Sequence, residues 1–187
     1  IGDVSPAGGK IFLIPSSTGN TTGKFFEAAA ADLSSSMAWC DNQSLAGANG
    51  YAIGTGEANT VAIDAACTSG AGQSAADYTN NGYGDWYLPS HDEFTAMLGL
   101  LTTIGGFATA SYWSSSEENW AAAKRFGLPD GVMSGHDKLQ SFKVRPIRSF
   151  EIKRSCLDIK NSTGTNANGM YTIALSLGGA VVNTPVY

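Results

Sequence analysis

Few side chains of this sequence are spaced for catalysis or for metal binding. Asp92 and Glu93 are adjacent carboxylates that could act as acid and base if both faced one cleft. They follow Ser90 in the order Ser-His-Asp-Glu, which is the pattern of a helix capping box, where the electrostatics of a helix start explain both acids. His91 and His136 have no histidine or cysteine at ligand spacing. We therefore predict a structural role for the acid pair and no metal site.

Two further patterns have only part of a catalytic or nucleotide-binding motif. Ser114, Ser115 and Ser116 lack the Gly-x-Ser-x-Gly setting of a nucleophile elbow. Residues 53–60, IGTGEANT, lack a preceding apolar strand and a third glycine at the spacing of a phosphate-binding loop. We therefore expect the protein not to be an enzyme.

The composition favours a loop-rich extracellular domain. Only 14% of the 187 residues are charged, 23 are glycine, and the net charge is −5. No basic block is present to bind nucleic acid or an anionic membrane, and no apolar run is long enough to span a bilayer. Cys40, Cys67 and Cys156 are too far apart for a CxxC motif, which leaves buried thiols or one disulfide.

The stretch 81–101, NGYGDWYLPSHDEFTAMLGLL, must position the acid pair. Asn-Gly marks a turn, two aromatic residues follow, and Pro89 precedes the capping residue Ser90. Phe94, Met97 and later leucines recur at helical spacing, which predicts a helix over about 90–101. A second helix is predicted in EANTVAIDAAC, residues 57–67, and one or two helical turns in 71–79.

Short apolar or alternating runs bounded by turn residues predict strands. They lie at 9–14, 25–28, 37–40, 112–116, 120–126 and 141–150, and residues 132–138 are a further short strand or loop. Pro146 makes the last of these an edge or bulged strand. The expected architecture is an α+β domain with twisted antiparallel sheet and two main helices.

Several of these segments also resemble a known family. DWYLPSHDEF at 85–94, GGF at 105–107, YWSSSE at 112–117 and VRPIRSF at 144–150 are similar to a bacterial domain family of the C-type-lectin fold, the type found at the end of the collagen-like adhesin Lcl. IGDVSPAGGKIF at 1–12 and IGTGEANT match the same family. The resemblance covers residues 1–150 and implies a C-type-lectin-like fold. It also implies a homo-oligomer, since the related domain is trimeric.

The resemblance sharpens three expectations. Cys40 and Cys67 flank short elements of the lectin-like half, so we predict a disulfide between them. Sugar-binding members of the fold hold calcium with Glu-Pro-Asn or Gln-Pro-Asp and Trp-Asn-Asp, and neither triplet occurs here. We therefore expect no cofactor, although calcium stays open because oxygen ligands are available in Glu117, Glu118, Asn119, Asp130 and Asp137.

The same fold includes the formylglycine-generating oxidases, whose Arg-Leu-Pro-Thr-Glu-Ala-Glu-Trp motif resembles WYLPSHDEF. Their copper chemistry requires a pair of cysteines near the closing strand. No cysteine lies between 68 and 155 in this sequence, which argues against an oxidase.

Residues 151–187 differ in character and are expected to form a C-terminal extension. SCLDIKNSTGTNANGMYTI resembles the start of a fibrinogen-like domain, whose first cysteine pairs with one just after a Pro-Val-Tyr-like segment. The sequence ends at Pro185-Val186-Tyr187, so the resemblance would place the partner of Cys156 immediately beyond. None of the calcium or ligand functions of that family can be transferred to this segment.

We predict an extracellular, secreted or cell-surface recognition or adhesion module that binds a glycan or a surface protein. Trp86, Phe107 and Trp113 are expected in the core. The expected ligand-binding residues are exposed aromatic and polar side chains of one cleft, namely Tyr83, Glu117, Asn119, Trp120, Asp130, His136 and Lys138. The alternative is a self-assembling subunit of an extracellular fibre, in which residues 151–187 dock on a neighbour.

Overall fold

The structure is a computed structural model that describes residues 1–152, 174–177 and 180–183. The chain divides into two units, Ile1–Ile152 and Lys153–Tyr187. In the second unit, β7 (Ala174–Leu177) pairs with β8 (Ala180–Asn183) as an antiparallel hairpin. Cys156 and most of the segment that resembles a fibrinogen-like domain lie outside the described residues.

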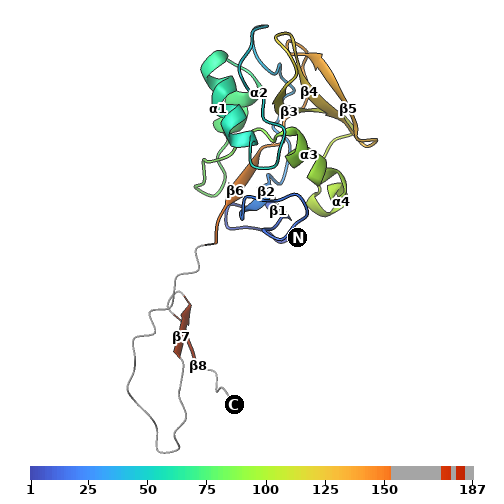
Figure 1. The fold of residues 1–187 in the computed structure, drawn as a ribbon. Helices are drawn as coiled ribbons and strands as arrows, with labels where there is room; N and C mark the ends of the chain where they lie inside the picture. The colour runs from blue at the N-terminus through green and yellow to red at the C-terminus, as the bar shows by residue number, and fades with distance from the viewer. Residues whose placement is uncertain (153–173, 178–179, 184–187) are drawn as a thin grey trace, which may run out of the picture. The chain divides into compact units, whose positions relative to one another are not determined.

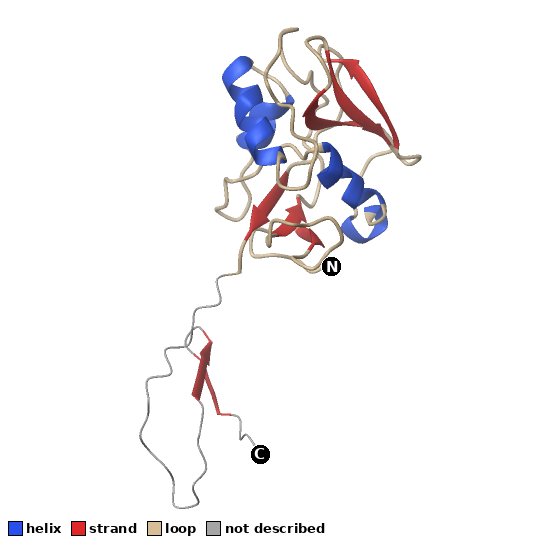
Figure 2. Cartoon of the chain, in the orientation of Figure 1, coloured by secondary structure: helices blue, strands red, loops and turns tan. Residues whose placement is uncertain are grey.

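The first unit has an α+β fold, as predicted from the sequence, with four helices and two small antiparallel sheets (Figure 1; Figure 2). One sheet has the order β1-β2-β6, and the other has the order β3-β4-β5. The strands are β1 (Lys10–Leu13), β2 (Phe25–Ala28), β3 (Ser111–Glu117), β4 (Ala122–Gly127), β5 (Val132–Asp137) and β6 (Ile147–Phe150). The helices are α1 (Gly56–Ala66), α2 (Ala71–Ala76), α3 (His91–Leu98) and α4 (Leu101–Ile104).

The capping box at the start of α3 is confirmed. The Ser90 hydroxyl accepts from the Glu93 N–H, and the Glu93 carboxylate accepts from the Ser90 N–H at 2.7 Å. The single helix expected over 90–101 is wrong, because α3 ends at Leu98 with Gly99 as its C-cap, and α4 is a separate short helix. Glycine has a low helix propensity, which explains why the helix is interrupted at Gly99.

One of the expected strands is absent, and the last one is shorter than the sequence indicated. Residues 37–40 form no strand, since Met37 makes only an isolated bridge to Phe142 and the Trp39 N–H donates to Lys138. Of 141–150, only β6 is a regular strand. It lies at an edge of its sheet, as expected for a strand that follows Pro146.

Three clusters of buried side chains hold the first unit together. One joins the β1-β2-β6 sheet to α3 through Phe12, Phe26, Phe94 and Phe126. A second surrounds Trp39, Ile63 and Trp113, and it contains the predicted Cys40–Cys67 disulfide, which is confirmed. Trp86 belongs to a small third cluster, while Phe107 is partly buried. Within the described residues, no helix has the length and apolar character needed to cross a membrane.

Candidate functional site

Three loops meet around a buried ion pair at one end of the β3-β4-β5 sheet. The Lys138 ammonium pairs with the Glu117 carboxylate, and both side chains are fully buried. Lys138 also donates to the Ser44 carbonyl at 2.6 Å, and Glu117 accepts from the backbone N–H groups of Ala46 and Gly47 at 2.8 and 2.9 Å. The pair therefore fixes loop 41–47, loop 117–121 and loop 137–140 to one another.

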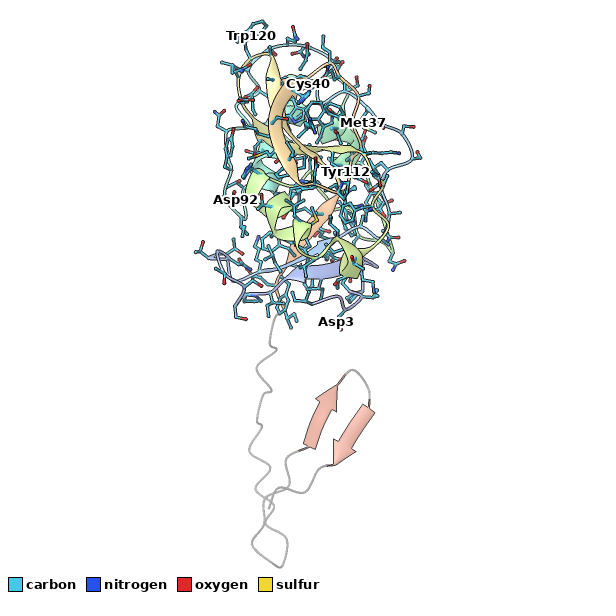
Figure 3. All side chains as sticks on the ribbon, turned by 90° about the vertical axis from the view of Figure 1, so that its right-hand side faces the viewer. Asp3, Met37, Cys40, Asp92, Tyr112 and Trp120 are labelled. Atoms are coloured by element: carbon cyan, nitrogen blue, oxygen red, sulfur yellow. A yellow bond between two sulfur atoms is a disulfide. The ribbon has the colours of Figure 1, made fainter. Side chains whose placement is uncertain are left out.

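Each of these loops exposes one large apolar side chain. The exposed fractions are 68% for Leu45, 59% for Trp120 and 52% for Leu139. Tyr51, which is 37% exposed, donates its hydroxyl to the Glu117 carbonyl at 3.3 Å. We call the four residues the apical surface. Figure 3 shows Trp120 at the tip of the first unit, at the opposite end from Asp3.

The structure separates the predicted binding residues in this region into exposed and buried ones. Asn119 and Trp120 lie in the exposed β3–β4 turn, and the Asn119 side chain stabilises that turn by accepting from the N–H groups of Ala121 and Ala122. The surface position expected for Glu117 and Lys138 is wrong. Their opposite charges neutralise each other, and backbone groups satisfy their remaining hydrogen bonds, so both can be buried.

The remaining predicted residues lie elsewhere. His136 on β5 is half-buried against Phe142, with its Nδ1 atom 2.9 Å from Gln140 Oε1. Asp130 lies in the β4–β5 turn, at the opposite end of the hairpin from the β3–β4 turn. Tyr83 packs with Trp86 and lies 4.4 Å from the guanidinium carbon of Arg148 on β6. The structure therefore does not bring these residues into the single cleft that the sequence suggested.

Sequence reasoning missed Leu45, Tyr51 and Leu139. Each is a lone apolar residue in a polar or glycine-rich loop, and a lone exposed apolar residue is common on protein surfaces. The available signal was that Leu45 and Leu139 each interrupt a segment that is otherwise polar or small, DNQSLAGANG and HDKLQS. Only the fold shows that they accompany Trp120.

The oxygen donors considered for calcium do not converge. Glu118 pairs with Lys124 at 2.9 Å, while Asp137 accepts from the Leu139 N–H and the Gln43 amide, and these hydrogen bonds lower the pKa of Asp137. The one described group of three acidic, histidine or cysteine side chains within ligand distance of one another is Cys40, Asp41 and Cys67. The sulfur atoms of Cys40 and Cys67 are bonded to each other in the disulfide, so they are not thiolate ligands.

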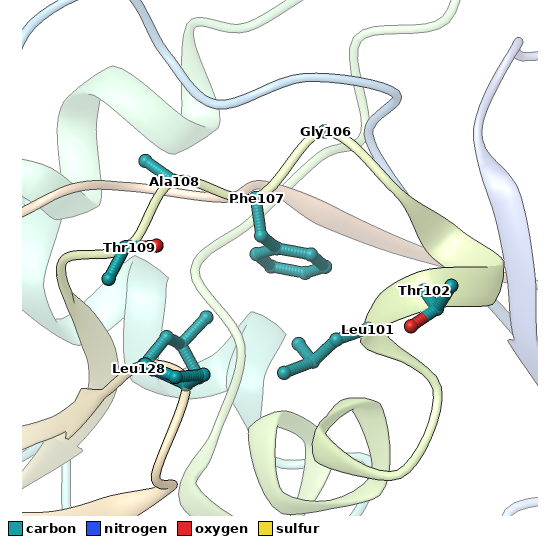
Figure 4. Close-up of a pocket in the computed structure, with 8 residues that line it drawn as sticks. Leu101, Thr102, Gly106, Phe107, Ala108, Thr109 and Leu128 are labelled. Atoms are coloured by element: carbon teal, nitrogen blue, oxygen red, sulfur yellow. The ribbon is translucent and has the colours of Figure 1, made fainter.

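A separate pocket of about 210 Å³ lies beside α4 (Figure 4). The Phe107 ring points into it between Leu101 and Leu128. The guanidinium carbon of Arg145 lies 4.0 Å from the centroid of the Phe107 ring. None of the lining side chains ionises; they are Leu101, Thr102, Gly106, Phe107, Ala108, Thr109, Leu128 and Pro129. The pocket therefore suits a small apolar contact and holds no acid or base.

The adjacent acids of α3 occupy different environments. Glu93 is fully buried and accepts from the Gly54 N–H at 2.8 Å as well as from Ser90. Burial raises the pKa of Glu93 from 4.5 to about 7. Asp92 is about half exposed, and its carboxylate lies 2.6 Å from His91 Nδ1. The two carboxylates therefore do not face one cleft.

The stability of the first unit should fall as the pH rises from 4.5 to about 7. The folded state holds a proton on Glu93 up to a higher pH than the unfolded chain does, so unfolding releases a proton in this window and higher pH favours it. Between pH values well below 4.5 and well above 7, the free energy of unfolding should fall by roughly 3 kcal/mol. Urea unfolding across this range measures it. E93Q should be less stable at pH 5 and should lose most of the pH slope, whereas D92N should keep it. Equal slopes in wild type and E93Q would contradict the assignment.

In comparisons with known proteins, no family model matches the chain, and no curated protein matches it either. The apical surface and the pockets are therefore interpreted from their own geometry.

Proposed function

We propose that the first unit is a non-catalytic extracellular recognition module with a C-type-lectin-like fold, which binds a glycan or a surface protein through its apical surface. The observation that carries this proposal is the set of three exposed apolar side chains on loops fixed by a buried ion pair. The motifs in residues 1–150 support the fold assignment. The disulfide supports an oxidising, extracellular location.

The apical surface has the physical properties of a binding site. Aromatic rings stack on the apolar faces of sugars and dominate protein interfaces, and Trp120 is the most exposed tryptophan among the described residues. Loops on a rigid scaffold bind well because little conformational freedom is lost on association. Here the Lys138–Glu117 pair and the Asn119 hydrogen bonds hold the loops in place before a ligand arrives.

Replacing Trp120 by alanine should weaken binding about tenfold or more, since truncation of an aromatic hot spot costs about 1.4 kcal/mol or more. A glycan array and an array of extracellular matrix proteins, probed with the purified chain, would identify ligands. Titration would then compare wild type with W120A.

The matched control is V132A, which removes an apolar side chain of similar exposure, 53%, from the β4–β5 end of the sheet. V132A should bind as wild type does. Equal affinity of W120A and wild type, or an equal loss in both variants, would exclude the apical surface as the binding site.

The alternative function, a self-assembling subunit of an extracellular fibre, is favoured by one observation. β5 is an edge strand, and its Val132 and Met133 are 53% and 41% exposed. Exposed apolar edge strands readily pair with another chain. Light scattering separates the two functions: growth into open-ended assemblies that V132K abolishes would support the fibre, while a fixed mass at all concentrations supports the recognition module.

A further inference from the structure

A second pocket, of about 170 Å³, lies between helix α1 and the segment that precedes α3. We call it the α1 groove. Its lining combines acidic and apolar side chains, namely Glu57, Thr60, Val61, Asp64, Ala76, Gly84, Asp85, Trp86 and Tyr87. It shares no lining residue with the apical surface or with the pocket beside α4.

One wall of the groove is a face of α1. Glu57, Val61 and Asp64 follow one another at spacings of four and three residues, so they lie on the same side of the helix. All three are exposed, and Val61 is 65% exposed. Asp85, with a side chain that is 55% exposed, adds a third carboxylate from the opposite wall.

The floor of the groove is apolar and held in place. Trp86 and Tyr87 are each only 3% exposed, and the Trp86 ring packs edge-on against Tyr78 with centroids 5.2 Å apart. The Thr60 hydroxyl accepts from the Leu88 N–H at 3.0 Å and donates to the Gly56 carbonyl at 2.8 Å. The hydrogen bond from Leu88 to Thr60 connects the middle of α1 to the segment that precedes α3, so the fold sets the width of the groove.

The groove carries net negative charge, and two of its three carboxylates, Glu57 and Asp64, have no cationic partner among residues 1–152. Its lining has three carboxylates and no cationic side chain. Asp85 pairs with Arg148, but Arg148 also pairs with Glu27 at 2.9 Å. Within residues 1–152, Glu57 and Asp64 form no ion pair. Burial raises the pKa of Tyr87 well above its usual range, and the charges of Glu93, Glu57 and Asp85 add to this effect.

We propose that the α1 groove receives an arginine side chain from a partner protein. The aliphatic stem of the arginine would lie along Val61 and the aromatic floor, and the guanidinium would lie among Glu57, Asp64 and Asp85. Long cationic side chains bury their apolar stem and keep their charged head at a polar rim. The groove matches this, because its floor is apolar and its rim carries the carboxylates. The planar guanidinium presents several N–H donors at once, so it matches more than one carboxylate better than an ammonium does.

The size and charge of the groove argue against a drug-sized or an anionic occupant. Sites for drug-sized molecules usually measure about 300–1,000 Å³, so a groove of 170 Å³ fits a single side chain. Nucleic acids and acidic glycans would be repelled by three carboxylates. This inference does not depend on the apical surface, and either binding site can fail experimentally without the other.

The test uses the whole chain labelled with ¹⁵N and two capped tripeptides, acetyl-Ala-Arg-Ala-amide and its citrulline analogue. Citrulline keeps the shape of arginine and removes its charge. The arginine peptide should shift the Trp86 indole signal and the amide signals of α1 in a saturable way, with a dissociation constant in the millimolar range, as expected for one side chain. The citrulline peptide should shift neither.

Two variants locate the site. E57Q/D64N should weaken binding of the arginine peptide about tenfold. Both residues are exposed, so the variant should keep the unfolding temperature of wild type. The matched control, D3N/D130N, removes two exposed carboxylates elsewhere and should leave the affinity unchanged. A lysine tripeptide should bind more weakly than the arginine peptide.

The proposal would be overturned by no saturable shift, by equal shifts with the citrulline peptide, by equal affinity for the lysine peptide, or by an unchanged affinity in E57Q/D64N. Shifts confined to the apical surface would also overturn it. A loss of glycan or matrix-protein binding in W120A, by contrast, would test only the proposed function of the apical surface.

Discussion

Replacing Lys138 by methionine should lower the free energy of unfolding of the first unit by about 3–5 kcal/mol, because it leaves a buried carboxylate without its cation. Glu117 would keep the N–H donors of Ala46 and Gly47, but the Ser44 carbonyl would lose its donor. The ammonium also lies 4.8 Å from the Trp39 ring, so a favourable cation–π contact disappears with it. Urea unfolding followed by tryptophan fluorescence measures the change.

The partly exposed pair of Lys124 and Glu118 is the matched control. Its side chains are 18% and 37% exposed, so K124M should cost less than about 1 kcal/mol. E117Q should destabilise the unit as strongly as K138M does, since it leaves a buried ammonium unpaired. If K138M and K124M changed the stability equally, the pair would not be buried in solution. K138M should also weaken apical binding, because the three loops lose their shared anchor.

Removal of the Cys40–Cys67 disulfide should be the second large effect. The bond closes a loop with a sequence separation of 27, for which the chain-entropy model predicts about 3.5 kcal/mol of stabilisation. Cys67 follows the last residue of α1, and both sulfur atoms are buried beside Trp39 and Ile63. The bond therefore connects the end of α1 to the loop that carries Leu45.

The comparison is best made between C156S and C40A/C67A/C156S, so that Cys156 cannot exchange with either partner. Urea unfolding should show the loss, and adding a reductant to C156S should reproduce it. The triple variant should stay insensitive to reductant. A stability within about 1 kcal/mol of C156S would mean that packing around Trp39 and Ile63, and not the covalent bond, holds this region.

Local signals made much of the scaffold predictable. The capping box is recognisable from Ser90 and Glu93 alone, and the alternation of apolar residues is recognisable within a single strand. The positions of α3 and of the β3-β4-β5 hairpins could therefore be predicted to within a few residues. The prediction of a strand at 37–40 is wrong because its apolar residues, Trp39 and Cys40, are buried in the second core cluster without pairing in a sheet. A short apolar run does not distinguish these two environments.

The apical surface could be predicted only in part, because it depends on contacts between distant segments. Asn119 is predictable from its position in the turn after Ser116, whereas the sequence pattern puts Trp120 at the start of a strand that in the structure begins only at Ala122. The sequence predicts surface positions for Lys138 and Glu117, since charged residues are rarely buried and no local pattern marks two charges 21 residues apart as partners. Leu45 belongs to the apical surface because the next residue, Ala46, donates its N–H to the Glu117 carboxylate. These two residues are 71 positions apart in the sequence.

The order β1-β2-β6 has a mechanical consequence. β1 and β6 are both antiparallel to β2, so they run parallel to each other on either side of it. Tension applied between Lys10 and Phe150 would pull the sheet from opposite ends, so it would shear the backbone hydrogen bonds of both strand pairs together rather than open them one at a time. The load would pass through β2 and would bypass the disulfide and the three apical loops. A tethered unit could thus bear force while the loops at its tip remain unstrained.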